Sequence, residues 1–143
     1  MSTATGTLTG QCLCGTVTIT TTQWSAQVSA CHCRLCRVWS GGVQFGFDAP
    51  CEAVTVTGTV RTFRSSSFAE RAFCQTCGTS LWLRDDNGPY EFVPGFFDGA
   101  SELPLVREVY ADRAFACATL VGDHPRVSRA EYEATQPHVE DQT

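Results

Sequence analysis

The chain has 143 residues, of which 43% are hydrophobic and 17% charged, and its formal net charge is −5. This balance is typical of one globular domain and excludes a disordered, collagenous or coiled-coil chain. No apolar run reaches the roughly 18 residues that a membrane-spanning helix needs, and the first ten residues lack the basic and apolar regions of a signal peptide. We therefore expect a cytoplasmic protein with no membrane partner.

Short strand-like segments dominate the chain. Alternation and β-branched residues predict strands, in chain order, at Thr16–Thr20, Val43–Phe47, Ala53–Thr57, Val60–Arg64, Gly78–Arg84 and Tyr90–Val93. The Asn-Gly pair within Asp85–Pro89 predicts that the last two strands form a hairpin. Helical signals are short and fall at Arg34–Trp39, Ser101–Leu103 and Ser128–Ala134, where Ser128 and Glu131 have capping-box spacing. The sequence thus predicts a mainly β fold of stacked antiparallel sheets with few short helices, forming one domain over residues 6–135.

Nine cysteines need an explanation, because a chain of this length can bury a core without disulfides. An odd number of thiols and a reducing compartment both argue against a disulfide framework. We read Cys51 and Cys117 as structural residues. The other seven cysteines form three tight clusters, which favours metal binding: Cys12 and Cys14; Cys31, Cys33 and Cys36; Cys74 and Cys77.

Two of these clusters together supply four ligands for a closed, structural zinc site. Residues i and i+2 of a strand point to the same side, so Cys12 and Cys14 can bind one ion while Leu13 faces the core. Gly15 allows the backbone to turn close to the metal. Cys74-Gln-Thr-Cys77-Gly78 has the spacing of a zinc knuckle. The alternative of a redox-active Cys74–Cys77 pair stays open, although a strand rather than a helix follows the pair.

The remaining cluster holds three thiols within six residues, Cys31, Cys33 and Cys36, and no obvious fourth ligand. Three protein ligands leave one coordination position open, and an open position distinguishes a catalytic zinc from a structural one. We expect His32 to point away from the metal because it alternates with two ligands. Alternatively, Cys51, Cys117 or a partner protein closes the site.

Positive charge is concentrated in the cysteine-rich part. Residues 1–84 hold six arginines against three acidic residues, residues 85–143 hold four against twelve, and the chain has no lysine. Seven thiolates on two Zn²⁺ would neutralise the excess, which argues against a nucleic-acid partner. Arginine recognises carboxylates with two parallel hydrogen bonds, so these side chains suit an acidic small molecule.

Three blocks of the sequence resemble the glutathione-dependent formaldehyde-activating enzyme family, also called the centromere-protein-V/Gfa family. They are Gly10–Val17, Cys31–Arg37 followed by Gly41, and Arg71–Leu81, and they occur in the family's order and spacing. Ser65–Ser67 and Gly95–Asp98 are also similar, so the likeness spans about residues 8 to 100.

The resemblance implies an Mss4-like fold with two zinc ions. A structural ion would be held by Cys12, Cys14, Cys74 and Cys77, and a labile, catalytic ion by Cys31, Cys33 and Cys36. It also implies a carbon–sulfur lyase that joins glutathione or a similar thiol to formaldehyde or another small electrophile. We expect Arg34, Arg37 or Arg71, and in particular Arg37 and Arg71, to contact the carboxylates of the thiol, and Trp39, Phe45 and Phe47 to line the pocket.

Other functions fit the same cysteine pattern. One is a non-enzymatic zinc-binding interaction or carrier module of the same fold. Another is an enzyme that uses zinc-bound hydroxide on a different electrophile. The sequence is also compatible with a homo-oligomer.

Overall fold

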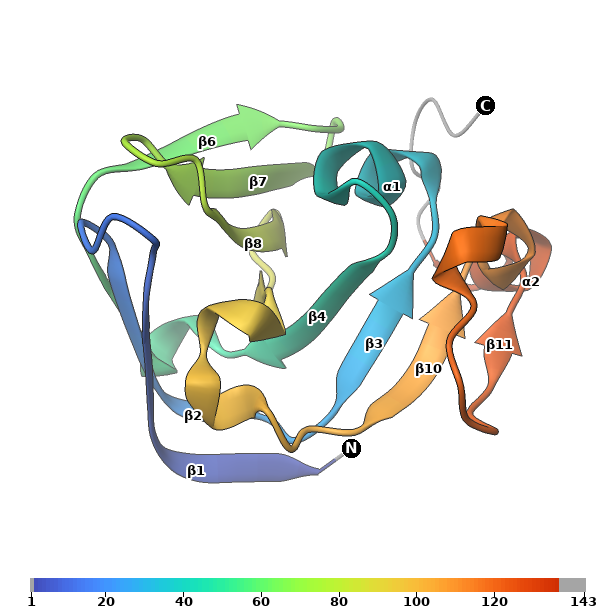
Figure 1. Cartoon of the computed structure of the whole chain (residues 1–143), viewed down its shortest axis with the longest axis horizontal. Helices are drawn as coiled ribbons and strands as arrows, with labels where there is room; N and C mark the ends of the chain where they lie inside the picture. The colour runs from blue at the N-terminus through green and yellow to red at the C-terminus, as the bar shows by residue number, and fades with distance from the viewer. Residues whose placement is uncertain (1, 137–143) are drawn as a thin grey trace. The chain divides into compact units, whose positions relative to one another are not determined.

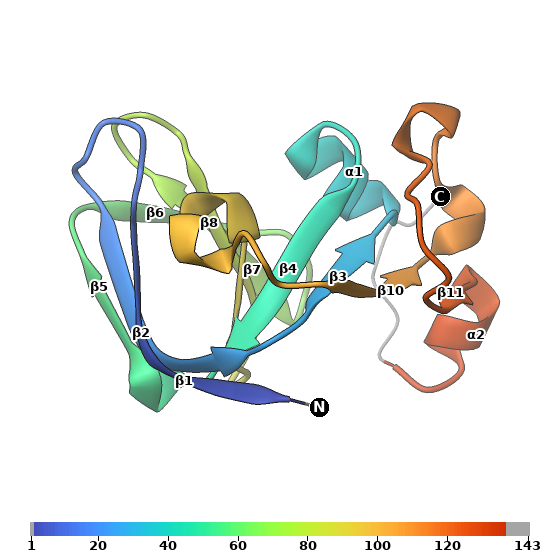
Figure 2. The same ribbon diagram turned by 60° about the horizontal axis from the view of Figure 1, so that its bottom comes forward.

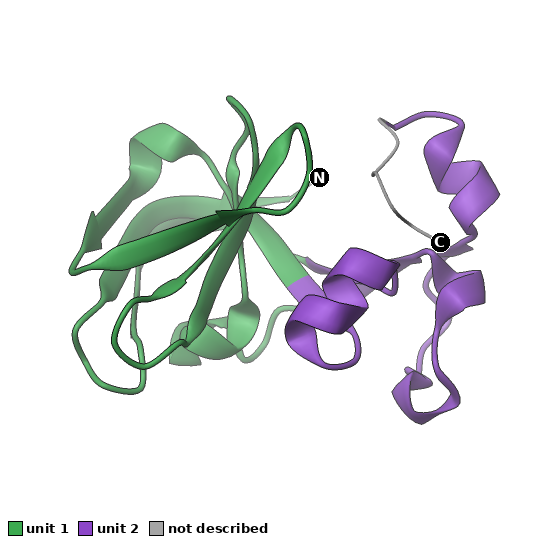
Figure 3. Cartoon of the chain, turned by 90° about the horizontal axis from the view of Figure 1, so that it is seen from above, with its two compact units in different colours: residues 1–27, 46–104 green, residues 28–45, 105–143 purple. Residues whose placement is uncertain are grey.

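The computed structural model describes residues 2–136, and the chain divides into two units (Figure 3). Unit 1 comprises Met1–Gln27 and Gly46–Pro104, and unit 2 comprises Val28–Phe45 and Leu105–Thr143. A single domain over residues 6–135 therefore stays a prediction. In the described part of the chain, no helix is long and apolar enough to cross a membrane.

Unit 1 contains two groups of antiparallel strands (Figures 1 and 2). The first group has the order β1-β2-β5, and in the second β4, β9, β8, β7 and β6 pair in that order, with β4 belonging to unit 1 from Gly46 on. The bounds of these strands are β1 Thr3–Gln11, β2 Thr18–Ser25, β4 Gln44–Ala49, β5 Val54–Thr57, β6 Val60–Arg64, β7 Ala69–Cys74, β8 Ser80–Asp85 and β9 Tyr90–Phe92. Strands β8 and β9 form the predicted hairpin, in which Trp82 pairs with Phe92.

The core of unit 1 is aromatic. Phe47 of β4 packs against Phe92 of β9 with ring centroids 6.0 Å apart, and both rings contact Phe97. All three side chains are at most 2% exposed. Two short 3₁₀ helices, Pro94–Phe96 and Asp98–Ala100, carry the chain past this core, and a further one spans Cys51–Ala53.

Unit 2 pairs its strands in parallel. Strand β3 (Val28–Cys31) pairs with β10 (Leu105–Val109), and β10 pairs with β11 (Arg126–Val127). Helix α1 (Arg34–Ser40) follows β3, and helix α2 (Arg129–Glu133) follows β11. Between β10 and β11 lie two 3₁₀ helices, Ala111–Arg113 and Ala116–Ala118.

The mainly β class and most predicted elements are confirmed. Helix α1 lies where it was predicted, and α2 begins with the predicted capping box, in which Ser128 Oγ accepts from the backbone N–H of Glu131. The antiparallel arrangement holds in unit 1, whereas the pairs of unit 2 are parallel. The sequence pattern missed β1, β3, β7, β10 and β11.

Two local predictions are wrong. Ser101–Leu103 is not helical, because the helical turn lies three residues earlier, at Asp98–Ala100. Leu13 does not enter the core: its side chain is 92% exposed. The residue sits at the tip of a tight turn, where the backbone N–H of Gly15 donates to the Cys12 carbonyl, rather than in a continuous strand with two faces.

Candidate metal centres

Four cysteines of unit 1 converge at the ends of its strands. Their sulfurs all lie within 4.8 Å of one another: Cys12, Cys14, Cys74 and Cys77. The Cys14 sulfur is 3.6 Å from that of Cys12 and 3.7 Å from that of Cys74. Zinc–sulfur bonds of about 2.3 Å in a tetrahedron separate the sulfurs by about 3.8 Å, so the donor set fits Zn²⁺.

The two cysteine pairs are built as similar turns. Cys12 N–H donates to the Val17 carbonyl, and Cys74 N–H donates to the Thr79 carbonyl. Each turn then reverses at a glycine with positive φ, 78° at Gly15 and 77° at Gly78, a conformation that disfavours a side chain. Leu13 N–H donates to the Thr79 hydroxyl at 3.2 Å and so links the two turns.

Hydrogen bonds from these turns favour the thiolate form of Cys12 and Cys77. The hydroxyl and backbone of Thr79 lower the pKa of Cys77 to about 5. Desolvation acts to raise the pKa of Cys12, but the Val17 N–H, 3.2 Å from the Cys12 sulfur, contributes to a net lowering. The Cys77 N–H also lowers the pKa of Cys74, but burial and the neighbouring sulfurs outweigh it and leave that pKa raised. Because a metal binds the thiolate, these donors support the cluster as a cation site.

The second cluster lies in unit 2, where β3 leads into α1. Cys31 ends β3, Cys33 is the N-cap of α1 and accepts from the Cys36 N–H, and Cys36 lies in the first helical turn. Their three sulfurs are also within 4.8 Å of one another. Within residues 2–136, no further cysteine, histidine or carboxylate ligand joins them.

Full ionisation of this three-cysteine cluster is unfavourable without a cation. The sulfurs of Cys33 and Cys36, together with burial, raise the pKa of Cys31 well above its usual value. Three thiolates side by side repel one another, and a divalent cation between them removes that repulsion. The donor set therefore also fits Zn²⁺, with one coordination position left over.

Residues from β10 and the C-terminal part of unit 2 pack against the cluster. Val109 and Tyr110 are buried with Cys33 and Cys36, and Val127 and Tyr132 pack against them. Tyr110 has φ 55° and ψ 37°, a rare conformation for a large side chain. Its hydroxyl donates to Glu133 at 2.8 Å, and its ring meets Tyr132 edge to face. These contacts hold the strained tyrosine beside the thiols.

His32 is not grouped with the three sulfurs, and its ring contacts a carboxylate instead. Its Nε2 lies 2.7 Å from a carboxylate oxygen of Glu108. Sequence reasoning missed Glu108, which lies 76 residues further along the chain. Nothing in its local pattern marks it, because only the pairing of β3 with β10 brings it to His32.

The other predicted site residues are divided between the units. In unit 2, the Arg37 guanidinium lies 4.5 Å from the centre of the Phe115 ring, and Arg34 is exposed. In unit 1, Arg71 on β7 is only 3% exposed. Roles for these arginines in binding a substrate stay predictions.

The predicted pocket aromatics are also divided between the two units. Trp39 and Phe45 are half-buried in unit 2, whereas Phe47 belongs to the aromatic core of unit 1. Neither single cysteine joins a cluster. Cys51 accepts from Arg84 at 2.9 Å, and Cys117 is exposed.

Comparison with known proteins identifies relatives that match most of the chain. The family model described as glutathione-dependent formaldehyde-activating enzyme matches residues 7–113, which include both clusters. An uncharacterized lyase of Schizosaccharomyces pombe is 33% identical over 106 residues, covering 72% of this chain and 77% of that protein. A crystal structure of a Rhodobacter sphaeroides protein has a TM-score of 0.56 at 20% identity, covering 68% of this chain and 99% of that one, a likeness that concerns the fold alone. The chain belongs to the glutathione-dependent formaldehyde-activating enzyme family.

Proposed function

We propose that this protein is a zinc-dependent carbon–sulfur lyase-type enzyme that adds glutathione, or a similar thiol, to formaldehyde or another small electrophile. The observation that carries the proposal is the difference between the two cysteine clusters. Four sulfurs converge in unit 1, but three converge in unit 2. A closed site is suited to holding the fold, and an open one to receiving a substrate. Family membership and the lyase name of the Schizosaccharomyces pombe relative support the reaction type.

The reaction itself is an addition. The substrate sulfur forms a bond to the carbonyl carbon, the π electrons of the C=O bond move to oxygen, and the thiol proton ends on that oxygen. Zn²⁺ bound at Cys31, Cys33 and Cys36 would supply positive charge that favours the thiolate form of the substrate. The chain's own residues hold the three sulfurs at the junction of β3 and α1 and surround them with apolar side chains.

Adduct formation is the direct test. Exchange between formaldehyde, glutathione and the adduct can be measured by NMR at equilibrium and corrected for the uncatalysed addition. We expect the wild type to accelerate exchange and Cys36→Ser to abolish the acceleration. Cys117→Ser, which removes an exposed cysteine outside both clusters, is the matched control and should behave like the wild type. If the zinc-loaded wild type does not accelerate exchange with any thiol, the enzymatic proposal is wrong.

Arg37 is our candidate for binding a carboxylate of the thiol. Its guanidinium is on the helix that carries Cys36, and stacking on Phe115 orients it. Arg37→Lys keeps the charge but loses the planar geometry, so glutathione should bind several-fold more weakly in calorimetry. Arg61→Lys, an exposed position on β6, is the control. S-methylglutathione should bind weakly to every variant if the free thiol is part of recognition.

A further inference from the structure

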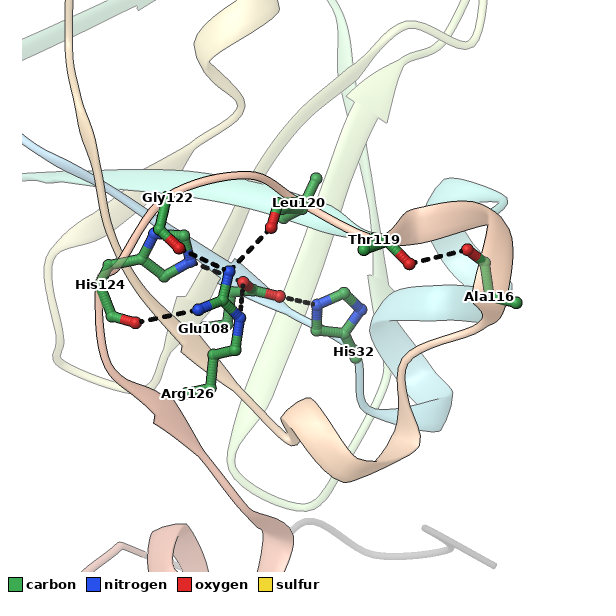
Figure 4. A network of polar contacts seen from close by, with 8 residues as sticks. All are labelled: His32, Glu108, Ala116, Thr119, Leu120, Gly122, His124 and Arg126. Atoms are coloured by element: carbon green, nitrogen blue, oxygen red, sulfur yellow. Dashed lines mark hydrogen bonds and ion pairs between the residues drawn. The ribbon is translucent and has the colours of Figure 1, made fainter.

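Unit 2 contains a buried polar network that the proposed reaction does not use. At its centre is the carboxylate of Glu108, whose side chain is 4% exposed (Figure 4). One oxygen is 2.7 Å from His32 Nε2. The other oxygen is 2.6 Å from His124 Nε2 and 3.1 Å from Arg126 Nε. Three side chains from two parts of the chain, His32 after β3 and His124 and Arg126 near β11, therefore converge on one carboxylate.

The network is anchored on its far side by the segment that leads into β11. Arg126 donates to the carbonyl oxygens of Leu120 and Gly122, at 2.8 and 2.9 Å. The Glu108 N–H donates to the Pro125 carbonyl, and Glu108 pairs with Arg126 in the parallel ladder. His124 and Arg126 lie after residue 113, where the family match ends. Two of the three side chains that hold the carboxylate thus lie beyond the matched residues.

On its near side the network reaches the three-cysteine cluster. His32 lies between Cys31 and Cys33, and its backbone N–H donates to the Val109 carbonyl at 3.1 Å. The His32 side chain is 1% exposed, and its Nδ1 has no hydrogen-bond partner among the described residues. Glu108 is therefore the group that fixes the orientation of the ring. Turning the ring away would leave a buried N–H without an acceptor, which is unfavourable.

We propose that Glu108 is a positioning residue for the three-cysteine centre. It holds His32, and through the His32 backbone it sets the direction of the Cys31 and Cys33 sulfurs, while His124 and Arg126 hold Glu108. Carboxylates behind metal ligands commonly act in this way, and their loss weakens metal binding about 10–100-fold. Here the carboxylate does not contact a cysteine ligand itself. It contacts His32, the residue between two of the ligands. The inference rests on the proposed function, because it requires a metal at the three cysteines.

Cobalt titration tests the role without measuring activity. With Zn²⁺ first bound at the four-cysteine cluster, Co²⁺ added to the full chain reports its affinity and ligand geometry through its visible spectrum. We expect Glu108→Ala and Glu108→Gln to weaken Co²⁺ binding about 10–100-fold and to change the spectrum. Arg126→Met, which keeps the side-chain stem and loses the guanidinium, should have a smaller effect in the same direction.

Two comparisons separate positioning from general stability. His32→Gln places an amide N–H where it can reach Glu108 and should keep the wild-type affinity, whereas His32→Leu should not. Asp86→Asn removes a carboxylate from an exposed ion pair with Arg64 in unit 1, and its spectrum should not change. Circular dichroism identifies variants that do not fold. If Glu108→Ala is among them, Glu108→Gln and Arg126→Met decide the outcome.

The results distinguish the two proposals. If the wild type takes up Co²⁺ and the folded Glu108 variants bind it with the same affinity and spectrum, Glu108 does not position the centre and the proposed function stands. If the wild type takes up no Co²⁺ beyond the four-cysteine cluster, the proposed function fails and this inference fails with it.

Discussion

The two groups of cysteines differ in the length of chain that each brings together. The pairs at Cys12 and Cys74 are about 60 residues apart, so a metal there connects two distant turns of unit 1. The cysteines of unit 2 span six residues of a single strand–helix junction. Closing a long loop costs chain entropy that closing a short one does not. A metal bound in unit 1 therefore stabilises the fold of that unit, whereas a metal bound in unit 2 stabilises only the junction of β3 and α1.

We expect Cys77→Ser to yield unfolded or insoluble protein and Cys33→Ser to fold. Structural zinc contributes about 10–16 kcal/mol in small peptides, as much as the roughly 5–15 kcal/mol net stability of a domain. Serine at position 33 still caps α1, because its hydroxyl can accept the Cys36 N–H. Circular dichroism and elemental analysis of both variants measure the difference. Equal loss of structure in the two proteins would show that this division of roles is wrong.

At the scale of elements, the first cysteine turn depends on the connection between β5 and β6. Gly58, in that connection, has φ 102°, and a Cβ built on it would lie 2.1 Å from the Thr16 carbonyl oxygen. Thr16 is part of the first turn, and its hydroxyl lies 3.1 Å from the Cys14 sulfur. The close approach of the Gly58 and Thr16 backbones therefore helps to fix the position of the Cys14 sulfur.

Gly58→Ala should destabilise the protein by about 1–3 kcal/mol or more, through backbone strain and displacement of Thr16. Gly42→Ala is the control, because no atom lies within 4 Å of its added Cβ. Urea unfolding of both variants gives the two free energies. We also expect faster zinc loss to a chelator in Gly58→Ala only. Equal stability of the two variants would contradict the steric argument.

In unit 2, helix α2 packs against the three-cysteine cluster through Tyr132. Its capping box satisfies N–H groups at the helix start, and its Tyr132 packs against Tyr110. Ser128→Ala should lower stability by about 1 kcal/mol and the melting temperature by a few degrees. Ser128→Asp, which keeps an acceptor at the N-cap, should behave like the wild type in the same thermal scans. A melting temperature for Ser128→Ala equal to that of Ser128→Asp would show that the cap contributes nothing measurable.

For the whole molecule, we predict two zinc ions per chain with different resistance to chelation. Four cysteines saturate a tetrahedral ion, whereas three leave a position that a chelator can occupy. Mild chelation should therefore remove about one equivalent quickly and leave the fold intact, and elemental analysis before and after measures this. A stoichiometry that never exceeds one, even with added zinc, would contradict a metal centre in unit 2.

The local sequence was sufficient to predict which cysteines lie together, although not that Cys12 and Cys14 lie on a tight turn rather than a strand. Ligand spacing is a local property, and so is the glycine that follows each pair in unit 1. The capping box of α2 and the β8–β9 hairpin were predictable for the same reason, since each depends on residues within a few positions of one another. The convergence of Cys12 and Cys14 with Cys74 and Cys77 followed from ligand number, because neither pair alone completes a tetrahedron.

Only the tertiary structure revealed what surrounds those ligands. Glu108 and His32 are 76 positions apart, and their contact depends on the parallel pairing of β3 with β10. The exposure of Leu13 depends on a turn that the alternating pattern does not distinguish from a strand. The amino-acid sequence by itself determined which atoms can bind a metal, because that is a property of residue type and spacing. Which groups orient those atoms was decided by strand pairing between distant segments, and a single sequence carries no local signal for that pairing.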